Sequence, residues 1–204
     1  MKKLILILSA TAGITFVSCN NNASSKDDQS MMNHDEKMPI QDNTMADKDV
    51  KMVAPTFTNM DPAVSSNMKS MVQDYLAIKN ALTNSNESEA ASAAGKMYDV
   101  LKGFDKSLLT ADQKKIYDGI EDDLREHAEH ISKSKIDHQR DHFSMMSNDM
   151  YDMVKAFGAG MTLYHDHCPM YKDGSMWLSE TKEIRNPYYG EKMMTCGSVK
   201  EMFQ

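Results

Sequence analysis

The sequence lacks an excess of basic residues and lacks the common catalytic motifs. Its 204 residues carry 23 Lys and Arg against 30 Asp and Glu, which gives a formal net charge of −7 at pH 7. A protein that binds nucleic acid needs a basic face, so this charge argues against a nucleic-acid partner. No G-x-S-x-G, P-loop, G-x-G-x-x-G or H-E-x-x-H motif occurs, and we therefore predict that the chain is not an enzyme.

Leucine is also scarce, although it is usually among the commonest residues of a soluble protein. Here 20 Met outnumber 11 Leu. Methionine is an adaptable filler of hydrophobic cores, and its thioether sulfur is also a soft ligand that favours Cu(I). The methionine bias is therefore a first indication of metal binding, but core packing alone is an alternative explanation.

The apolar stretch near the N-terminus is too short to span a membrane. Two lysines precede it and Ser18-Cys19 follow it, so residues 1–18 are predicted to be a signal peptide. A small residue before Cys19 resembles a lipobox, which predicts that Cys19 is lipidated and anchors the chain to a membrane. The predicted location is the cell envelope, at the periplasmic face of the outer membrane or at the cell surface. An ordinary secreted protein that is cleaved elsewhere is the alternative.

Residues 19–60 are rich in Asn, Asp, Ser, Lys and Met, with few aromatic residues and no apolar period. This composition predicts a disordered tether. The tether contains Met31-Met32 close to His34, and such Met/His tracts resemble the copper-gathering segments of bacterial metal-resistance proteins. A linker with chance methionines is the alternative.

From residue 61 onward, apolar residues recur with a period near 3.6, which is typical of amphipathic helices. We predict four helices, over residues 61–83, 87–104, 110–131 and 137–157. The third begins at Thr110-x-x-Gln113, a capping box. Short connections favour an antiparallel four-helix bundle, so the predicted fold class is all-α. The residues from about 158 onward are expected to form an irregular lobe that contains two cysteines.

Two thiol–thioether pairs lie in this lobe. Cys168-x-Met170 and Met193-x-x-Cys196 each place a thiol and a thioether within reach of one point on a tight loop. These soft ligands favour Cu(I), so the four residues are candidate copper ligands. In an oxidising compartment, however, two cysteines of a small exported domain usually form a disulfide. A structural bond between Cys168 and Cys196 is therefore the alternative.

The last two predicted helices contribute four histidines: His127, His130, His138 and His142. His138 and His142 are four residues apart, so they lie on one helix face, beside the apolar stripe. They are candidate ligands that would complete the sulfur site if the lobe packs on the fourth helix, and solvated surface is the alternative. His127 falls within an apolar stripe and is expected to be a core histidine.

Several short motifs occur in an order that resembles a known family. They are Tyr75-x-x-Ile78-Lys79-x-Ala81-Leu82, His138-Gln139-Arg140-x-x-Phe143, Cys168-Pro169-Met170, Trp177-Leu178-Ser179, and Asn186-Pro187-Tyr188-Tyr189-Gly190 with Cys196-Gly197. Residues 65–203 thereby resemble domain-of-unknown-function family 3347. Members are typically exported bacterial proteins, and similar domains are fused to adaptor subunits of copper and heavy-metal efflux systems. The resemblance implies a metal-linked role, with copper as the metal and efflux components as partners.

Two main hypotheses for the function follow, and a redox enzyme that uses Cys168 and Cys196 is a third reading. The first is a lipid-anchored extracytoplasmic protein that buffers or delivers Cu(I), with six candidate ligands: Cys168, Met170, Met193, Cys196, His138 and His142. The second is a disulfide-stapled interaction module of an envelope or efflux complex that has no metal site. Its candidate contact residues are Trp177, Tyr188 and Tyr189, since aromatic residues are frequent interface anchors, although packing inside the lobe would also account for them.

Overall fold

The computed structural model describes residues 50–204. The predicted signal peptide, the lipidation site Cys19 and the tether up to residue 49 therefore lie outside the described residues. The helices are α1 (Pro62–Thr83), α2 (Glu87–Lys102), α3 (Ala111–Asp118), α4 (Glu121–Lys133) and α5 (Ile136–Phe157), with 3-10 turns η2 (Lys106–Leu108) and η3 (Gly190–Lys192). The strands are β1 (Lys51–Val53), β2 (Leu163–Cys168), β3 (Ser175–Ser179) and β4 (Ser198–Phe203). Within residues 50–204, no helix is both long and apolar enough to cross a membrane.

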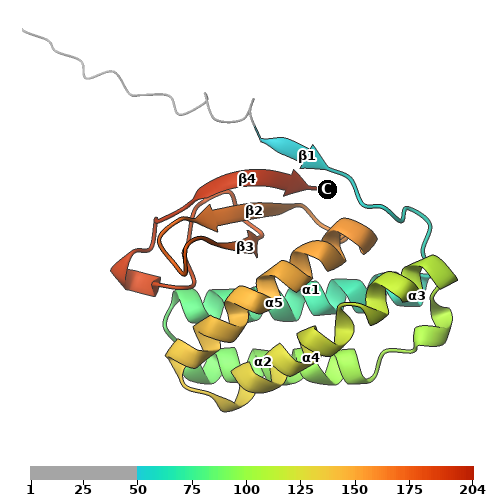
Figure 1. The fold of residues 1–204 in the computed structure, drawn as a ribbon, viewed down its shortest axis with the longest axis horizontal. Helices are drawn as coiled ribbons and strands as arrows, with labels where there is room; N and C mark the ends of the chain where they lie inside the picture. Colours follow the sequence, from blue (N-terminus) through green and yellow to red (C-terminus); the bar gives the residue numbers. More distant parts are fainter. Residues whose placement is uncertain (1–49) are drawn as a thin grey trace, which may run out of the picture. The chain divides into compact units, whose positions relative to one another are not determined.

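The predicted all-α fold class is wrong, because a four-stranded mixed sheet packs with the helices. Its strand order is β1-β4-β2-β3, with β1 parallel to β4 and the other neighbours antiparallel. Figure 1 shows this sheet lying over α1 and α5, with α2 and α4 on the far side of the helical layer. The lobe from residue 158 onward therefore contributes β2, β3 and β4 to the sheet, with loops and η3 between them, and the protein is mixed α/β.

The N-terminal strand comes from residues that the sequence places in the tether. After β1, the chain returns to the end of α5, where the Thr56 and Phe57 N–H groups donate to the carbonyls of Lys155 and Ala156 at 3.0 and 2.9 Å. Three residues are too few for a recognisable strand pattern in a polar tract. The folded part therefore includes the segment between β1 and α1.

Two of the expected helix starts are confirmed. The Asp61 side chain accepts the Ala63 N–H at 2.7 Å, ahead of α1. Thr110 and Gln113 form the capping box at the start of α3. The predicted third helix, however, is interrupted at Gly119, where α3 ends and the chain turns before α4 begins at Glu121.

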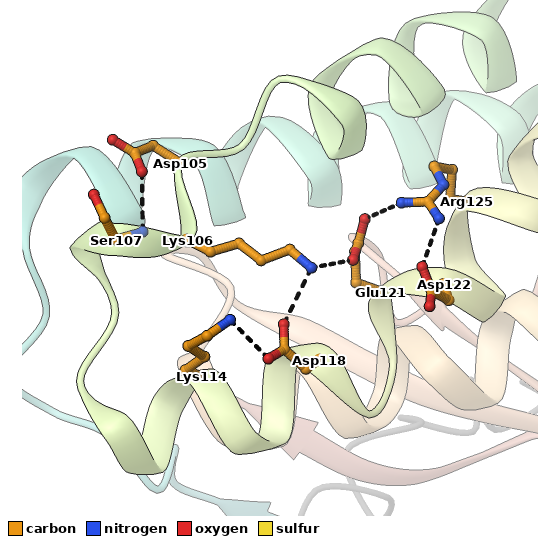
Figure 2. A network of polar contacts seen from close by, with 8 residues as sticks. All are labelled: Asp105, Lys106, Ser107, Lys114, Asp118, Glu121, Asp122 and Arg125. Atoms are coloured by element: carbon orange, nitrogen blue, oxygen red, sulfur yellow. Dashed lines mark hydrogen bonds and ion pairs between the residues drawn. The ribbon is translucent and has the colours of Figure 1, made fainter.

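A polar network fixes the start of α4 where no side chain caps it. Figure 2 shows Lys106 of η2 reaching between Asp118, at 3.1 Å, and Glu121, at 2.6 Å. Glu121 is almost fully buried, and it also pairs with Arg125, which contacts Asp122 at 2.5 Å. Because Glu121 is the first residue of α4, these pairs set where the helix begins and which way its side chains point.

Part of the methionine bias is explained by the hydrophobic core. Six methionines of the helices are buried: Met68, Met71, Met97, Met146, Met150 and Met153. They pack with the predicted apolar stripes of α1, α2 and α5, which are buried as expected. Core packing is sufficient for these residues, so they give no support to metal binding.

One carboxylate is buried between the sheet and the helices. Asp166 lies on β2 opposite Trp177 of β3 and has no solvent exposure. Neither carboxylate oxygen has a hydrogen-bond partner, and the Trp177 indole N–H beside it does not reach hydrogen-bond geometry. Burial raises the pKa of Asp166 to about 8, a rise that the Lys79 ammonium moderates. A buried charge without a hydrogen bond is costly, so the neutral acid is favoured.

We expect Asp166→Asn to remove part of the loss of stability that accompanies a rise in pH from 3.8 to about 8. The Asp166 carboxyl stays protonated in the folded protein up to about pH 8 but ionises near its ordinary value of 3.8 when unfolded. Wild-type stability therefore falls as the pH rises through this window, whereas the amide does not titrate. Urea unfolding at pH 5 and pH 9 should show a wild-type loss that exceeds the variant's by on the order of 2 kcal/mol. Equal losses would contradict the assignment.

Candidate metal centre

The turn between α4 and α5 folds these two helices back along each other. The Glu87 carboxylate of α2 accepts the Ile136 N–H at 3.0 Å and pairs with Lys135 at 2.9 Å. The Gln139 side-chain amide donates to the carbonyls of Ile131 and Glu87, both at 3.0 Å. Because Gln139 is fully buried, these bonds fix how α4 and α5 are aligned.

This hairpin gathers the helical histidines into one cluster. His130, His138 and His142 each offer a ring nitrogen, and these three atoms lie within 4.8 Å of one another. The His130 ring stacks on His142 with centroids 4.2 Å apart, and His138 lies 4.6 Å from His142. His130 and His138 are exposed, whereas His142 is buried. In the described part of the chain, no other group of three or more His, Cys, Asp or Glu converges in this way.

His127 extends the cluster inward. Its Nδ1 lies 3.1 Å from Nδ1 of His142, so one ring can donate a hydrogen bond to the other. Its Nε2 lies 3.6 Å from the Asp149 carboxylate. Asp149, His127 and His142 therefore form a line of polar contacts that leads to the three converging nitrogens. Contact with His127 occupies Nδ1 of His142 and leaves Nε2 of His142 for a ligand. Metal-binding histidines commonly have their other ring nitrogen held by a hydrogen bond in this way.

Burial keeps the two inner histidines, His127 and His142, uncharged at neutral pH. Burial, together with the three neighbouring imidazoles, lowers the pKa of His142 to about 4. Burial also lowers the pKa of His127. Burial raises the pKa of Asp149 to about 6, and the carboxylates of Asp123 and Asp152 contribute to the rise. A histidine must be neutral to bind a metal, so His142 is ready to do so at neutral pH.

The donor set fits a transition-metal ion. Neutral imidazole nitrogens suit Zn, Cu, Fe and Ni. Metal–nitrogen bonds of about 2.0–2.1 Å would require the three rings to close in slightly. Three protein ligands also leave a position open for water or for a donor from another molecule, which is the arrangement of exchangeable rather than closed structural sites.

The predicted sulfur ligands do not join this cluster. Cys168 and Cys196 do meet, as free thiols whose Sγ atoms are 2.8 Å apart. The side chains of Met170 and Met193, at 61% and 38% exposure, are open to solvent. Contact with Cys168 raises the pKa of the Cys196 thiol to about 11. A thiol must lose its proton to bind a metal, so this contact works against metal binding by Cys196.

The sequence predicted only part of the histidine cluster. His138 and His142 do share one face of α5, as predicted, but their neighbours are His127 and His130 of α4 rather than the lobe. His127 was expected to be a core histidine with a hydrogen-bond partner, and its side chain is 13% exposed and contacts His142 beside Asp149. The i, i+3 spacing of His127 and His130 was a signal that these two residues also lie on one helix face.

The aromatic residues considered as partner contacts are mostly internal. Trp177 is fully buried and Tyr188 nearly so. Tyr189 is half-buried, and its hydroxyl donates to the Met170 carbonyl at 2.7 Å. Packing therefore accounts for Trp177 and Tyr188.

The metal-free protein should lose stability in mild acid because of His142. The pKa of His142 is about 4 in the folded protein against an ordinary value of 6.5. Between these two pH values, the unfolded chain binds a proton at His142 that the folded chain does not bind. Stability that is present above pH 6.5 is lost as the pH falls toward 4. Urea unfolding in EDTA should show this loss, and His142→Gln should reduce it by on the order of 2 kcal/mol. An unchanged acid profile in the variant would contradict the burial argument.

The comparisons with known proteins identify a family over the central part of the chain. The model of the family described as "Protein of unknown function (DUF3347)" matches residues 71–162, which confirms the predicted family. This span runs from within α1 to the residue before β2 and contains all four clustered histidines. Cys168, Cys196 and the motifs after residue 162 lie outside it. No curated protein and no solved structure matches the chain.

Proposed function

Because the family whose model matches residues 71–162 is described as being of unknown function, we propose a function from the side chains themselves: the protein binds a transition-metal ion through His130, His138 and His142. The observation that carries this proposal is the convergence of three ring nitrogens within 4.8 Å. His130 and His138 are exposed, so an ion can enter and leave from solvent. Such a site suits a protein that buffers or delivers its metal.

Copper is the metal that we propose, as Cu(II) rather than Cu(I). Among divalent ions, a nitrogen site binds Cu(II) most tightly, and zinc is the next candidate. Cu(I) would be favoured by the soft sulfur ligands expected from the sequence, but Met170 and Met193 are exposed and do not join the histidine group. The acidic chain, with a net charge of −7, also attracts cations.

The proposed setting is the cell envelope, and it rests on the sequence alone. Lipidation at Cys19 would tether the domain to a membrane, and the Met/His tract around His34 would gather ions near it. The partners we propose are heavy-metal efflux components, which would take the ion by ligand exchange at the open position of the histidine site.

A disulfide-stapled interaction module is the second candidate. The contact between the Cys168 and Cys196 thiols favours it. The burial of Trp177 and Tyr188 weighs against it, since these two side chains are not available as anchors for a partner.

Replacing both exposed histidines, as His130→Asn with His138→Asn, should weaken Cu(II) binding by more than about 100-fold. The reason is that one remaining imidazole cannot chelate the ion. A competition titration of the full chain against a chelator measures the change. His167→Asn is the matched control, because His167 lies on β2 outside the cluster, and it should leave the affinity unchanged. A double variant that binds as tightly as wild type would refute the site.

Replacing Asp149 by Asn should weaken Cu(II) binding by about 10-fold. Asp149 holds His127, and His127 in turn holds Nδ1 of His142, so loss of the carboxylate leaves His142 less well oriented. The control is Asp152→Asn, which removes the same charge from a neighbouring carboxylate that no histidine contacts at ion-pair distance. If both variants lose affinity equally, the effect is one of charge alone and the positioning role is wrong.

A further inference from the structure

Cys168 and Cys196 form a pair of free thiols that is separate from the histidine group. Cys168 ends β2 and is fully buried, whereas Cys196 lies in the loop before β4 and is partly exposed. The two residues are 28 positions apart in the chain, yet their Sγ atoms are 2.8 Å from each other. Two free thiols in contact, one buried and one partly exposed, have unequal access to any reagent.

The backbone on both sides of Cys196 is held in place. The buried Asn186 side chain donates from Nδ2 to the Cys196 carbonyl at 2.7 Å, and its Oδ1 accepts the Tyr188 N–H at 2.8 Å. On the other side, Gly197 passes over Trp177 so closely that a Cβ at this position would lie 2.8 Å from the indole ring. The fold therefore builds the approach of Cys196 to Cys168.

We propose that Cys168 and Cys196 are a thiol–disulfide exchange site that closes into an intramolecular disulfide by reaction with the disulfide of another molecule. This inference is independent of the proposed metal site, because no histidine of that cluster takes part. The incoming disulfide, from a small molecule or a protein, is the oxidant.

The unequal burial of the two thiols sets the order of the reaction. The partly exposed Cys196 loses its proton, against the raised pKa that contact with Cys168 gives it, and its thiolate attacks one sulfur of the incoming disulfide, forming a mixed disulfide and releasing the first thiol. Cys168 then loses its proton, and its thiolate attacks Sγ of Cys196, forming the internal bond and releasing the second thiol. Two protein thiols are oxidised, and the incoming disulfide takes up two electrons and two protons.

The new bond would link the end of β2 to the loop that connects β3 with β4 and contains η3. That loop also contacts α5, because Nε of Arg140 donates to the Pro187 carbonyl at 3.1 Å. The same guanidinium donates to the Leu82 carbonyl at the end of α1, at 3.3 Å. Forming the disulfide would therefore fix the loop between β3 and β4, which contacts the sheet and, through Arg140, the helices α1 and α5.

Intact-protein mass spectrometry with oxidised glutathione tests the closure. The full-length chain is used with Cys19→Ser in every sample, so that only the two remaining thiols react, and EDTA removes metals that would catalyse oxidation. We expect the reduced protein to lose two hydrogens and to carry no glutathione at the end. A protein that stays reduced, or that accumulates glutathione adducts without closing, would overturn the proposal.

Single variants test the order of attack. Cys168→Ser should trap one glutathione on Cys196, because the resolving thiol is missing. Cys196→Ser should stay unmodified under the same conditions, because Cys168 is buried. Equal modification of both variants would overturn the proposed order.

Thermal unfolding tests the consequence for the fold. The oxidised protein should unfold about 10 °C above the reduced protein, as expected for closing a loop of this length. Oxidised glutathione should give no such shift in Cys196→Ser. Identical unfolding temperatures for the closed and reduced forms would overturn the claim that the bond fixes the loop.

Discussion

The alignment of α4 with α5 is the constraint on which the histidine cluster depends. Adjacent residues of a helix point about 100° apart, so a slip of one residue would separate the rings on one helix from those on the other. Glu87 prevents this by holding the Lys135 ammonium and the Ile136 N–H, while Gln139 ties the first turn of α5 to the end of α4. These polar contacts, most of them to backbone atoms, position the site without forming part of it.

Core packing does not explain the outer half of this cluster. His130 and His138 are exposed, so they bury little apolar surface, and an aligned group of imidazoles at the surface has no evident structural benefit. The inner half of the cluster is costly for a different reason, which is the burial of its ionisable groups. His142 and the partly buried His127 share a single line of contacts that ends at Asp149, and burial disfavours charge on all three. A bound cation would stabilise this arrangement, which links the electrostatics of the site to its proposed function.

The sequence was sufficient for the helices but not for the sheet. The apolar periods of α1, α2 and α5 and the caps at Asp61 and Thr110 are local signals, and local signals decided those elements. The strands depend on partners that are distant in the chain. β2 carries a buried Asp166 between two histidines, which hides any alternation of apolar and polar residues, and its partners β3 and β4 follow only later in the chain.

The site, like the sheet, depends on contacts between residues that are distant in the chain. Helical spacing placed His138 and His142 on one face of α5, but which element faces them depends on how α4 packs, and that in turn depends on the interruption at Gly119 before α4 begins.

X-ray absorption spectroscopy of the copper-loaded full-length protein tests the central claim most directly, because it identifies the atoms bound to the metal. Copper held by the histidine cluster should show nearest neighbours of nitrogen at about 2.0 Å with the multiple-scattering pattern of imidazole, and no sulfur. The pattern should disappear in the variant that lacks His130 and His138. A sulfur shell at about 2.3 Å would contradict the account and would return the metal to the cysteines and methionines of the sheet lobe or the N-terminal tract.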